Sequence, residues 1–450
     1  MKRARVAAVA LGIGFVTAWT TSCASEADPR PNVVLIVADD LGYGQLGSYG
    51  SAEPTPVLDR LASSGVRLTD GYAAAPICLP SRASLLTGLY HQRFRDAQSI
   101  PRRHRMLMQV LQQAGYATGC IGKWHQGVDT QNHPLEWGCD EFFGFLGGLH
   151  DYHAADLTLD EYRRALPDAS YSDRIRLQRF SPILAGTREV DSFDYLTREL
   201  SERAVDFIRR EGRRRSRPFL LYLAYNAIHG PLQSPDVRQP PVGPRRGDVT
   251  RDMIRELDVG VGRVLDTLEE EDLRKNTLVV FTSDNGALFA PGLGRVNGPL
   301  RGAKASYAEG GLRVPFVWSW PAGLPAGTVY RRPVSQLDIL PTVVAAAGAE
   351  ILLGEEIDGV DLLPFLRGNE RGEPHAVLYW GDREGRRYAL RSQRWKLLRD
   401  RDGEPARLFD LVRDPGEQID LAQSQVERVR VMQAQHAAWS DVVATSRDAK

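Results

Sequence analysis

The sequence predicts an α/β protein: a large mixed, mostly parallel sheet flanked by helices, with a small C-terminal antiparallel sheet and helix. Continuous apolar runs rich in β-branched residues are typical of strands buried on both faces of a parallel sheet. These runs are 32–38, 116–122, 218–225 and 276–283. The helical segments at 193–210 and 253–268 each carry apolar residues on one face, as expected of helices that cover a sheet. Beyond Glu373, shorter apolar runs predict antiparallel strands.

The chain has 450 residues, more than one ordinary core organises, so we expect a large domain with a smaller one attached. We place the large domain at 32–372 and the small one at 373–450. Apolar residues make up 42% of the chain, enough for a sizeable core. Lys plus Arg and Asp plus Glu number 57 each, so the overall charge indicates neither a nucleic acid nor an anionic membrane as partner.

Residues 1–24 have the pattern of an export signal. A basic leader precedes an apolar stretch that is too short for a membrane span. The small residues before Cys23 resemble a bacterial lipoprotein cleavage site, which would make Cys23 the lipidated N-terminus, and cleavage after Ala24 is the alternative. A polar tether follows at 25–31. We therefore expect an exported protein, in the periplasm, lipid-anchored at the cell envelope, or secreted.

The chain contains four cysteines, and two of them, Cys120 and Cys139, have no evident chemistry. Export would permit a disulfide between them. The sequence does not show that they approach each other, so two unpaired core thiols are the alternative.

Acidic residues follow two of the predicted strands at their carboxyl ends, where sites collect in open α/β sheets. Asp39 and Asp40 come directly after the first strand, and Asp284 and Asn285 follow 276–283. Adjacent carboxylates repel each other and lose hydration unless a cation or donors compensate. Oxygen ligands favour a hard cation such as Ca²⁺, with Mg²⁺ as the alternative. Taken alone, each sequence is more typical of a solvated turn.

Cys78 stands at the start of a short predicted helix. A helix N-terminus offers the positive end of the backbone dipole and unpaired amide donors, which favour bound anions. Arg82 lies one helical turn further on and adds a fixed fork of donors. A buried core thiol is the alternative interpretation of Cys78 alone.

Further cationic side chains lie at strand ends and in loops. Lys123 and His125 follow the run 116–122, and side chains two residues apart in an extended segment point the same way. His229 follows the strand at 218–225, and Lys304 lies in a loop. Considered singly, these would be surface lysines and ordinary loop or partly buried histidines.

Together these sequences resemble the signatures of the formylglycine-dependent sulfatases of the alkaline phosphatase superfamily. Cys78 begins Cys-x-Pro-Ser-Arg, which a short helix and Thr-Gly follow. Lys123 and His125 lie in Gly-Lys-Trp-His, and Lys304 ends Leu-Arg-Gly-x-Lys. The resemblance extends over about 32–422, nearly the whole mature chain.

This resemblance implies that a formylglycine-generating maturation enzyme oxidises Cys78, and that the hydrate of the formylglycine supplies the nucleophilic oxygen. A divalent cation, Ca²⁺ or Mg²⁺, would be bound by Asp39, Asp40, Asp284 and Asn285. The other site residues would be Arg82 and His125 at the hydrate, Lys123 and Lys304 at the sulfate, and His229 at the leaving oxygen.

The implied activity is that of an arylsulfatase-like sulfuric ester hydrolase acting on sulfate monoesters. For an exported protein we expect sulfated glycans as substrates, with small aryl sulfates as an alternative. Two rival functions are a phosphonate monoester or phosphodiester hydrolase on the same fold, and an inactive exported glycan-binding protein. The loop-rich stretch 137–193 is expected to form part of the substrate wall, with a mobile surface loop as the alternative.

Overall fold

The computed structural model describes residues 29–94, 100–154, 156–190, 192–289, 292–350 and 356–448. The predicted export signal, the lipidation site Cys23 and most of the tether lie outside this part of the chain. Among the described helices, none combines the length and the apolar composition that crossing a membrane requires.

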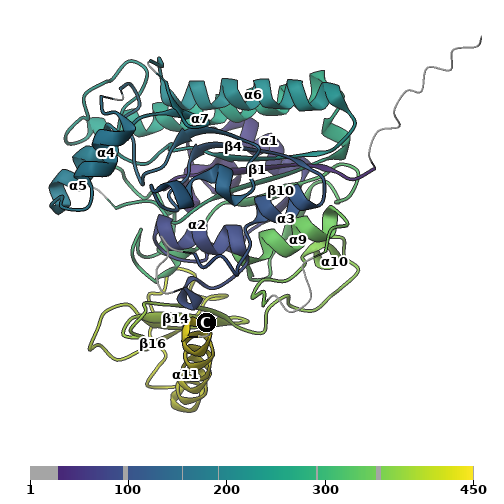
Figure 1. The fold of residues 1–450 in the computed structure, drawn as a ribbon. Coiled ribbons are helices and arrows are strands. Elements are labelled where there is room, and N and C mark those ends of the chain that lie inside the picture. Colours follow the sequence, from purple (N-terminus) through teal and green to yellow (C-terminus); the bar gives the residue numbers. More distant parts are fainter. Residues whose placement is uncertain are drawn as a thin grey trace, which may run out of the picture.

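A ten-stranded sheet forms the centre of the molecule (Figure 1). Its strand order is β11-β2-β10-β9-β1-β8-β4-β5-β6-β7. The neighbours from β9 through β1, β8 and β4 to β5 run parallel, whereas β10 is antiparallel to β9, so the predicted mixed, mostly parallel sheet is confirmed. The strands are β1 Asn32–Ala38, β2 Val66–Leu68, β4 Ala117–Lys123, β5 Glu141–Phe145, β6 Leu184–Ala185, β7 Arg188–Glu189, β8 Phe219–Ala224, β9 Thr277–Ser283, β10 Phe316–Ser319 and β11 Thr328–Tyr330.

Helices cover both faces of this sheet, as predicted. In β1, Val33 and Val37 pack into one hydrophobic cluster and Val34 and Ile36 into another, because successive side chains point to opposite faces. The first face carries α2 Cys78–Thr87, α3 Leu107–Gln113, α9 Ile339–Ala346 and α10 Leu363–Leu366. The second carries α1 Pro56–Ser64, α6 Leu196–Arg214 and α7 Arg245–Glu270, and Figure 1 shows α6 and α7 on the opposite side of the sheet from α2 and α9.

The C-terminal residues form a separate antiparallel sheet with a closing helix, also as predicted. Its strands pair in sequence order, and the helix continues to the end of the described chain. These elements are β13 Leu378–Gly381, β14 Tyr388–Ser392, β15 Trp395–Arg399, β16 Arg407–Asp410 and α11 Val426–Asp448.

A buried ion network joins this small sheet to the large domain. Lys396 in β15 lies with its Nζ 2.8 Å from Glu309 and 3.1 Å from Glu417, and all three side chains are fully buried. Glu309 begins α8 Glu309–Leu312, a short helix of the large domain. Because unpaired buried charges are costly, the two parts are held in one relative position.

Shorter elements complete the fold. The strands β3 Gly71–Tyr72 and β12 Val334–Ser335 form a two-stranded parallel sheet. The stretch 137–193, expected to be rich in loops, includes β5, β6 and β7 together with the helices α4 Leu159–Ala165 and α5 Tyr171–Arg179. It is therefore more regular than its sequence indicated.

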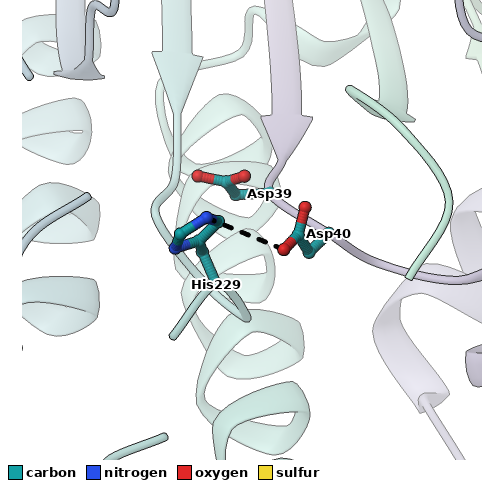
Figure 2. A group of neighbouring side chains, drawn as sticks. All are labelled: Asp39, Asp40 and His229. Carbon is teal, nitrogen blue, oxygen red and sulfur yellow. Dashed lines mark ion pairs between the residues drawn. The ribbon is translucent and has the colours of Figure 1, made fainter. Parts of the chain in front are cut away.

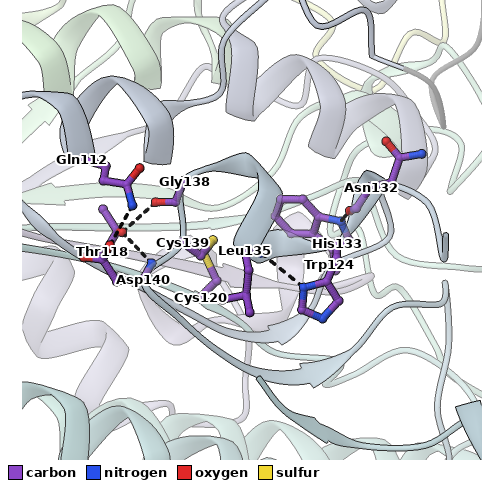
Figure 3. The surroundings of a disulfide bond; sticks show 10 residues. All are labelled: Gln112, Thr118, Cys120, Trp124, Asn132, His133, Leu135, Gly138, Cys139 and Asp140. Carbon is purple, nitrogen blue, oxygen red and sulfur yellow. Dashed lines mark hydrogen bonds between the residues drawn. A yellow bond between two sulfur atoms is a disulfide. The ribbon is translucent and has the colours of Figure 1, made fainter. Parts of the chain in front are cut away.

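Cys120 in β4 and Cys139, just before β5, form a disulfide (Figure 3). Their Cα atoms lie 6.0 Å apart, and both residues are buried. The neighbouring Thr118 hydroxyl donates to the Gly138 carbonyl, which holds the chain before β5 against β4. Of the two arrangements left open by the sequence, the structure has the paired one.

We predict that replacing both Cys120 and Cys139 with Ala lowers the free energy of unfolding by about 3 kcal/mol, because the bridge restricts the unfolded chain between them. Denaturant unfolding of the oxidised wild type and the double variant measures this difference. A reducing agent should lower the free energy of unfolding of the wild type to the value of the variant and leave that of the variant unchanged. Equal free energies of unfolding of the two proteins without a reducing agent would contradict the prediction.

His375 links the segment before β13 to the large domain through a titratable contact. Its Nε2 lies 2.7 Å from Asp338 Oδ1 in a largely buried pair. Burial alone would lower the pKa of His375, but the Asp338 carboxylate outweighs it and raises that pKa above the ordinary value. Since the folded-state pKa exceeds the unfolded one, this pair stabilises the fold fully below about pH 6.5 and less as pH rises through the folded-state pKa.

We therefore predict that His375→Gln lowers the free energy of unfolding by about 1.5–3 kcal/mol at pH 6, the usual size of a charged hydrogen bond. The difference from wild type should shrink at pH 9, where the imidazole is neutral. Denaturant titrations at the two pH values test this, and a loss of the same size at both would show that the charge of His375 does not matter.

Candidate active site

The acidic residues predicted at strand ends lie together at one edge of the sheet. Ala38 of β1 pairs with Ser283 of β9, so the residues that follow the two strands lie side by side. The Asp40 amide lies 3.3 Å from Asp284 Oδ1. Asp40 also has a φ of 60°, a left-handed conformation that is uncommon outside glycine and that turns the chain at this edge.

Two cations from other elements compensate these carboxylates. Lys123, the last residue of β4, donates from Nζ to Asp39 Oδ2 at 2.5 Å. Arg82 in α2 donates from Nε to Asp284 Oδ2 at 2.8 Å, and all four side chains are fully buried. Burial raises the pKa of Asp39, but nearby cations, Lys123 foremost, bring it below its ordinary value. Burial and the Asp39 carboxylate instead raise the pKa of Asp284 to about 6.

A third cation, Lys304, lies in a loop that hydrogen bonds hold in place on both sides. Its Nζ lies 2.7 Å from Asp40 Oδ1. The next residue donates its amide to the Pro76 carbonyl at 2.8 Å, two positions before Cys78. On the other side, Ser306 donates its hydroxyl to Asp400, which follows β15. The Lys304 loop is thus fastened both to the Cys78 segment and to the small C-terminal sheet.

Cys78 is the first residue of α2, as the sequence predicts, and it is a free, buried cysteine. Arg82 lies one turn further along the same helix. Burial raises the pKa of the Cys78 thiol, while Lys123 and Lys304 act in the opposite direction. The net increase keeps the thiol protonated at neutral pH, so Cys78 does not have the lowered pKa of a thiolate nucleophile.

His125 reaches the site by a route that the sequence did not predict. We expected an extended segment with Lys123 and His125 on one face, but β4 ends at Lys123 and His125 has a φ of 57°. A left-handed residue breaks the alternation of a strand, so the prediction from periodicity was wrong. Burial, then Lys123 and Arg82, lower the pKa of His125, which shows that the ring lies among the site's cations.

Gly148 also lies in this part of the site, although we did not predict it from the sequence. A Cβ at this position would come within 2.6 Å of His125 Nε2, so only glycine leaves room for the ring. The pair Gly147 and Gly148 was a visible signal, but nothing in the sequence connected it with His125.

His229 lies beside the first two carboxylates, as Figure 2 shows. Its Nε2 is 3.7 Å from Asp40 Oδ2, and its Nδ1 is 2.8 Å from the Gly230 carbonyl. With Nδ1–H donating to that carbonyl, Nε2 is the atom that faces the site. Burial lowers the pKa of His229, while Asp39 and Asp40 oppose this effect.

Two oxygen atoms of the cluster lack a hydrogen-bond donor within the described residues: Asp39 Oδ1 and Asn285 Oδ1, both buried. Asn285 uses its amide NH₂ to donate to Asp40 Oδ1 at 2.7 Å, which leaves its oxygen unpaired. Buried acceptors without partners are costly, and a hard cation is a natural partner for such oxygens. The ligand atoms of Asp39, Asp40 and His229 also lie within 4.8 Å of one another. The residues present therefore fit a divalent cation.

The histidines of the stretch 137–193 do not offer free side chains to a substrate. Both ring nitrogens of His150 lie 2.6 Å from backbone carbonyls, and those of His153 also contact backbone carbonyls. The Tyr152 hydroxyl donates to the carbonyls of Asn226 and His229. Tyr152 thus holds the backbone that carries His229, because buried polar groups need partners. The substrate wall at 137–193 stays a prediction.

Comparison with known proteins identifies the family of the chain. Residues 31–349 match the family described as Sulfatase, and residues 304–439 match the one described as the C-terminal part of N-sulphoglucosamine sulphohydrolase. The chain is 35% identical to N-acetylgalactosamine-6-sulfatase of Canis lupus familiaris, over 80% of this chain and 70% of that protein. It is 36% identical to steryl-sulfatase of Mus musculus, over 79% of this chain and 68% of that protein.

Solved structures give the same assignment. The crystal structure of Ps i-CgsB in complex with k-i-k-neocarrahexaose is similar to this fold, with a TM-score of 0.80, 34% identity, and 93% of this chain and 94% of that chain covered. The family match covers most of the chain, including every strand end that contributes to the site, and these relatives cover 79% or more of it. The chain therefore belongs to the sulfatase family of sulfuric ester hydrolases.

Proposed function

We propose that this protein removes sulfate from sulfated saccharides by means of a formylglycine made from Cys78 and a bound divalent cation. The observation that carries the proposal is the position of Cys78, buried where the charges of Lys123, Lys304 and Asp284 all act on it. A maturation enzyme would convert the thiol to the aldehyde before or during folding. When present, the hydrated formylglycine would supply the nucleophilic oxygen at this position.

The cation would be held by oxygen atoms of Asp39, Asp40, Asp284 and Asn285. The unpaired oxygens of Asp39 and Asn285 support this set, and such ligands suit Ca²⁺, or Mg²⁺ as the alternative. A cation bound there would help to neutralise the sulfate oxygens.

The protein's own side chains have distinct tasks in this proposal. Lys123 and Lys304 bind the sulfate, since an ammonium group has three donors and each carboxylate contact uses only part of them. Arg82 and His125 orient the group at position 78 from α2 and from the turn after β4. His229, with Nε2 facing the site, would protonate the leaving oxygen in its imidazolium form, which the nearby Asp39 and Asp40 carboxylates favour.

Saccharide substrates and export are supported by different observations. The similar Ps i-CgsB structure contains a neocarrahexaose, and N-acetylgalactosamine-6-sulfatase is among the related proteins. The disulfide between Cys120 and Cys139 suits an oxidising compartment. We therefore place the protein in the periplasm, at the cell envelope through a lipid on Cys23, or outside the cell.

Mass spectrometry of the peptide that contains residue 78 should detect an aldehyde in place of the thiol when the protein is purified from its native host in active form. Cys78→Ala should lower kcat by about 10⁴-fold or more, because a nucleophile is lost. Sulfate release from an aryl sulfate and from defined sulfated saccharides measures activity, with the melting temperature as the control for folding.

Two results would contradict this mechanism: full activity with an unmodified Cys78, or activity that survives Cys78→Ala. A strong preference for an aryl phosphodiester or phosphonate monoester over the aryl sulfate would assign the rival activity. Absence of all hydrolysis, with saccharide binding retained, would indicate a binding protein.

The choice of metal ligands predicts that Ca²⁺ raises the melting temperature of the metal-depleted protein, since a ligand that binds only the folded state stabilises it. Asn285→Ala should abolish this increase, and His229→Ala should retain it while activity falls. Calorimetric titration with Ca²⁺ and Mg²⁺ gives the affinities directly. Loss of Ca²⁺ binding in His229→Ala would instead make His229 a metal ligand.

A further inference from the structure

A cavity of about 250 Å³ opens beside the candidate active site. Asp40 lines it, and so do Ile228 and Gly230, the two neighbours of His229. In the proposed function His229 protonates the leaving oxygen, so the group attached to that oxygen must lie on this side. The cavity is therefore placed to receive the leaving group.

Most of the wall is apolar. Leu232, Pro240, Pro241, Leu288 and Val296 contribute to it. Two polar side chains of the wall already have partners: Gln45 accepts the Gly42 amide through Oε1, and the Thr250 hydroxyl donates to the Arg246 carbonyl. Such a wall favours the flat face of a ring, and it leaves few groups to recognise polar substituents.

Arg246 is a charged side chain in this largely apolar wall. Its Nε donates to the Pro241 carbonyl at 3.3 Å, and within the described residues neither of its terminal nitrogens has a hydrogen-bond or ion-pair partner. It lies in the first turn of α7, where the backbone dipole adds positive potential. A fork of free donors in a largely apolar cavity is suited to a planar or tetrahedral oxyanion.

Two of the three arginines of the adjoining cavity differ in this respect, and the third, Arg295, is exposed. That cavity shares Gln45, Thr250 and Val296 with the first and extends to Arg251 and Arg255. Arg251 contacts Asp248, and Arg255 lies 2.7 Å from Asp252. Their charges are already compensated within α7, whereas the charge of Arg246 is not.

The size of the first cavity limits what can fit. At about 250 Å³ it lies just below the ~300–1,000 Å³ range of typical small-molecule sites, so it has room for about one ring, and the adjoining cavity shares part of its wall. An anion bound by Arg246 would therefore be a substituent of the ring that carries the sulfate ester, or of the residue directly attached to it.

We propose that Arg246 is a specificity-determining residue that binds a second oxyanion, sulfate or carboxylate, on the leaving group. This inference rests on the proposed function and adds the chemistry of the substrate: the preferred sulfate ester carries another negative charge about one ring away. A monosulfated neutral ring fills the same cavity without pairing Arg246.

Matched aryl sulfates test the proposal, because each pair has one ring and differs in one charge. For the carboxylate arm the substrates are 4-carboxyphenyl sulfate and its methyl ester, and for the sulfate arm hydroquinone disulfate and 4-methoxyphenyl sulfate. Sulfate release gives kcat/KM for wild type and Arg246→Gln. We expect the variant to lose at least tenfold more on the charged member of one or both pairs than on the neutral member, mainly through KM. The arm with the larger loss identifies the oxyanion.

Arg245→Gln is the matched control, since it removes the same charge from the neighbouring, exposed position of α7, and it should change each kcat/KM by less than twofold. Arg246→Lys should recover part of the charged-substrate activity. Equal losses on charged and neutral substrates, or equal effects of the two glutamine variants, would overturn the assignment of Arg246. If the wild type released sulfate from none of the four esters, that result would instead contradict the proposed function.

Discussion

Three carboxylates buried at the ends of neighbouring strands impose the main constraint on this structure. Burying the charges of Asp39, Asp40 and Asp284 costs several kcal/mol each unless cations or donors compensate them. Their partners come from three different elements: α2 supplies a guanidinium, β4 a lysine and the loop before α8 another lysine. The cations to which we assign roles in the chemistry thus also hold these elements together.

The small C-terminal sheet contributes to this arrangement at a distance. Asp400 accepts hydrogen bonds from Ser306 and from the Tyr307 amide, directly after Lys304. Lys396 and Glu417 hold the start of α8 in the same segment through buried contacts. The position of Lys304 therefore depends on a part of the chain about 90 residues further on. The same contacts hold the two sheets together as one unit.

The two sides of the site have different physical character. Toward Cys78 the side chains are charged and largely buried, which suits a small anion held by several cations. Beyond His229 the wall becomes apolar, with Arg246 as the cation whose charge is not compensated within the described residues. The first side suits the sulfate that all substrates share, and the second suits the group by which they differ.

From the sequence alone, the parallel strands β1, β4, β8 and β9, several covering helices and the residues at the strand ends could be predicted, because apolar periodicity and turn residues are local signals. The resemblance of short motifs likewise assigned Cys78, Lys123 and Asp284 to one site. Local signals do not contain the backbone turn at His125, where the strand periodicity failed, or the space that Gly148 leaves for its ring. Tertiary structure also decided the pairing of Cys120 with Cys139 and, among the described residues, the unpaired oxygen of Asn285 and the uncompensated guanidinium of Arg246, because each depends on which distant segments meet.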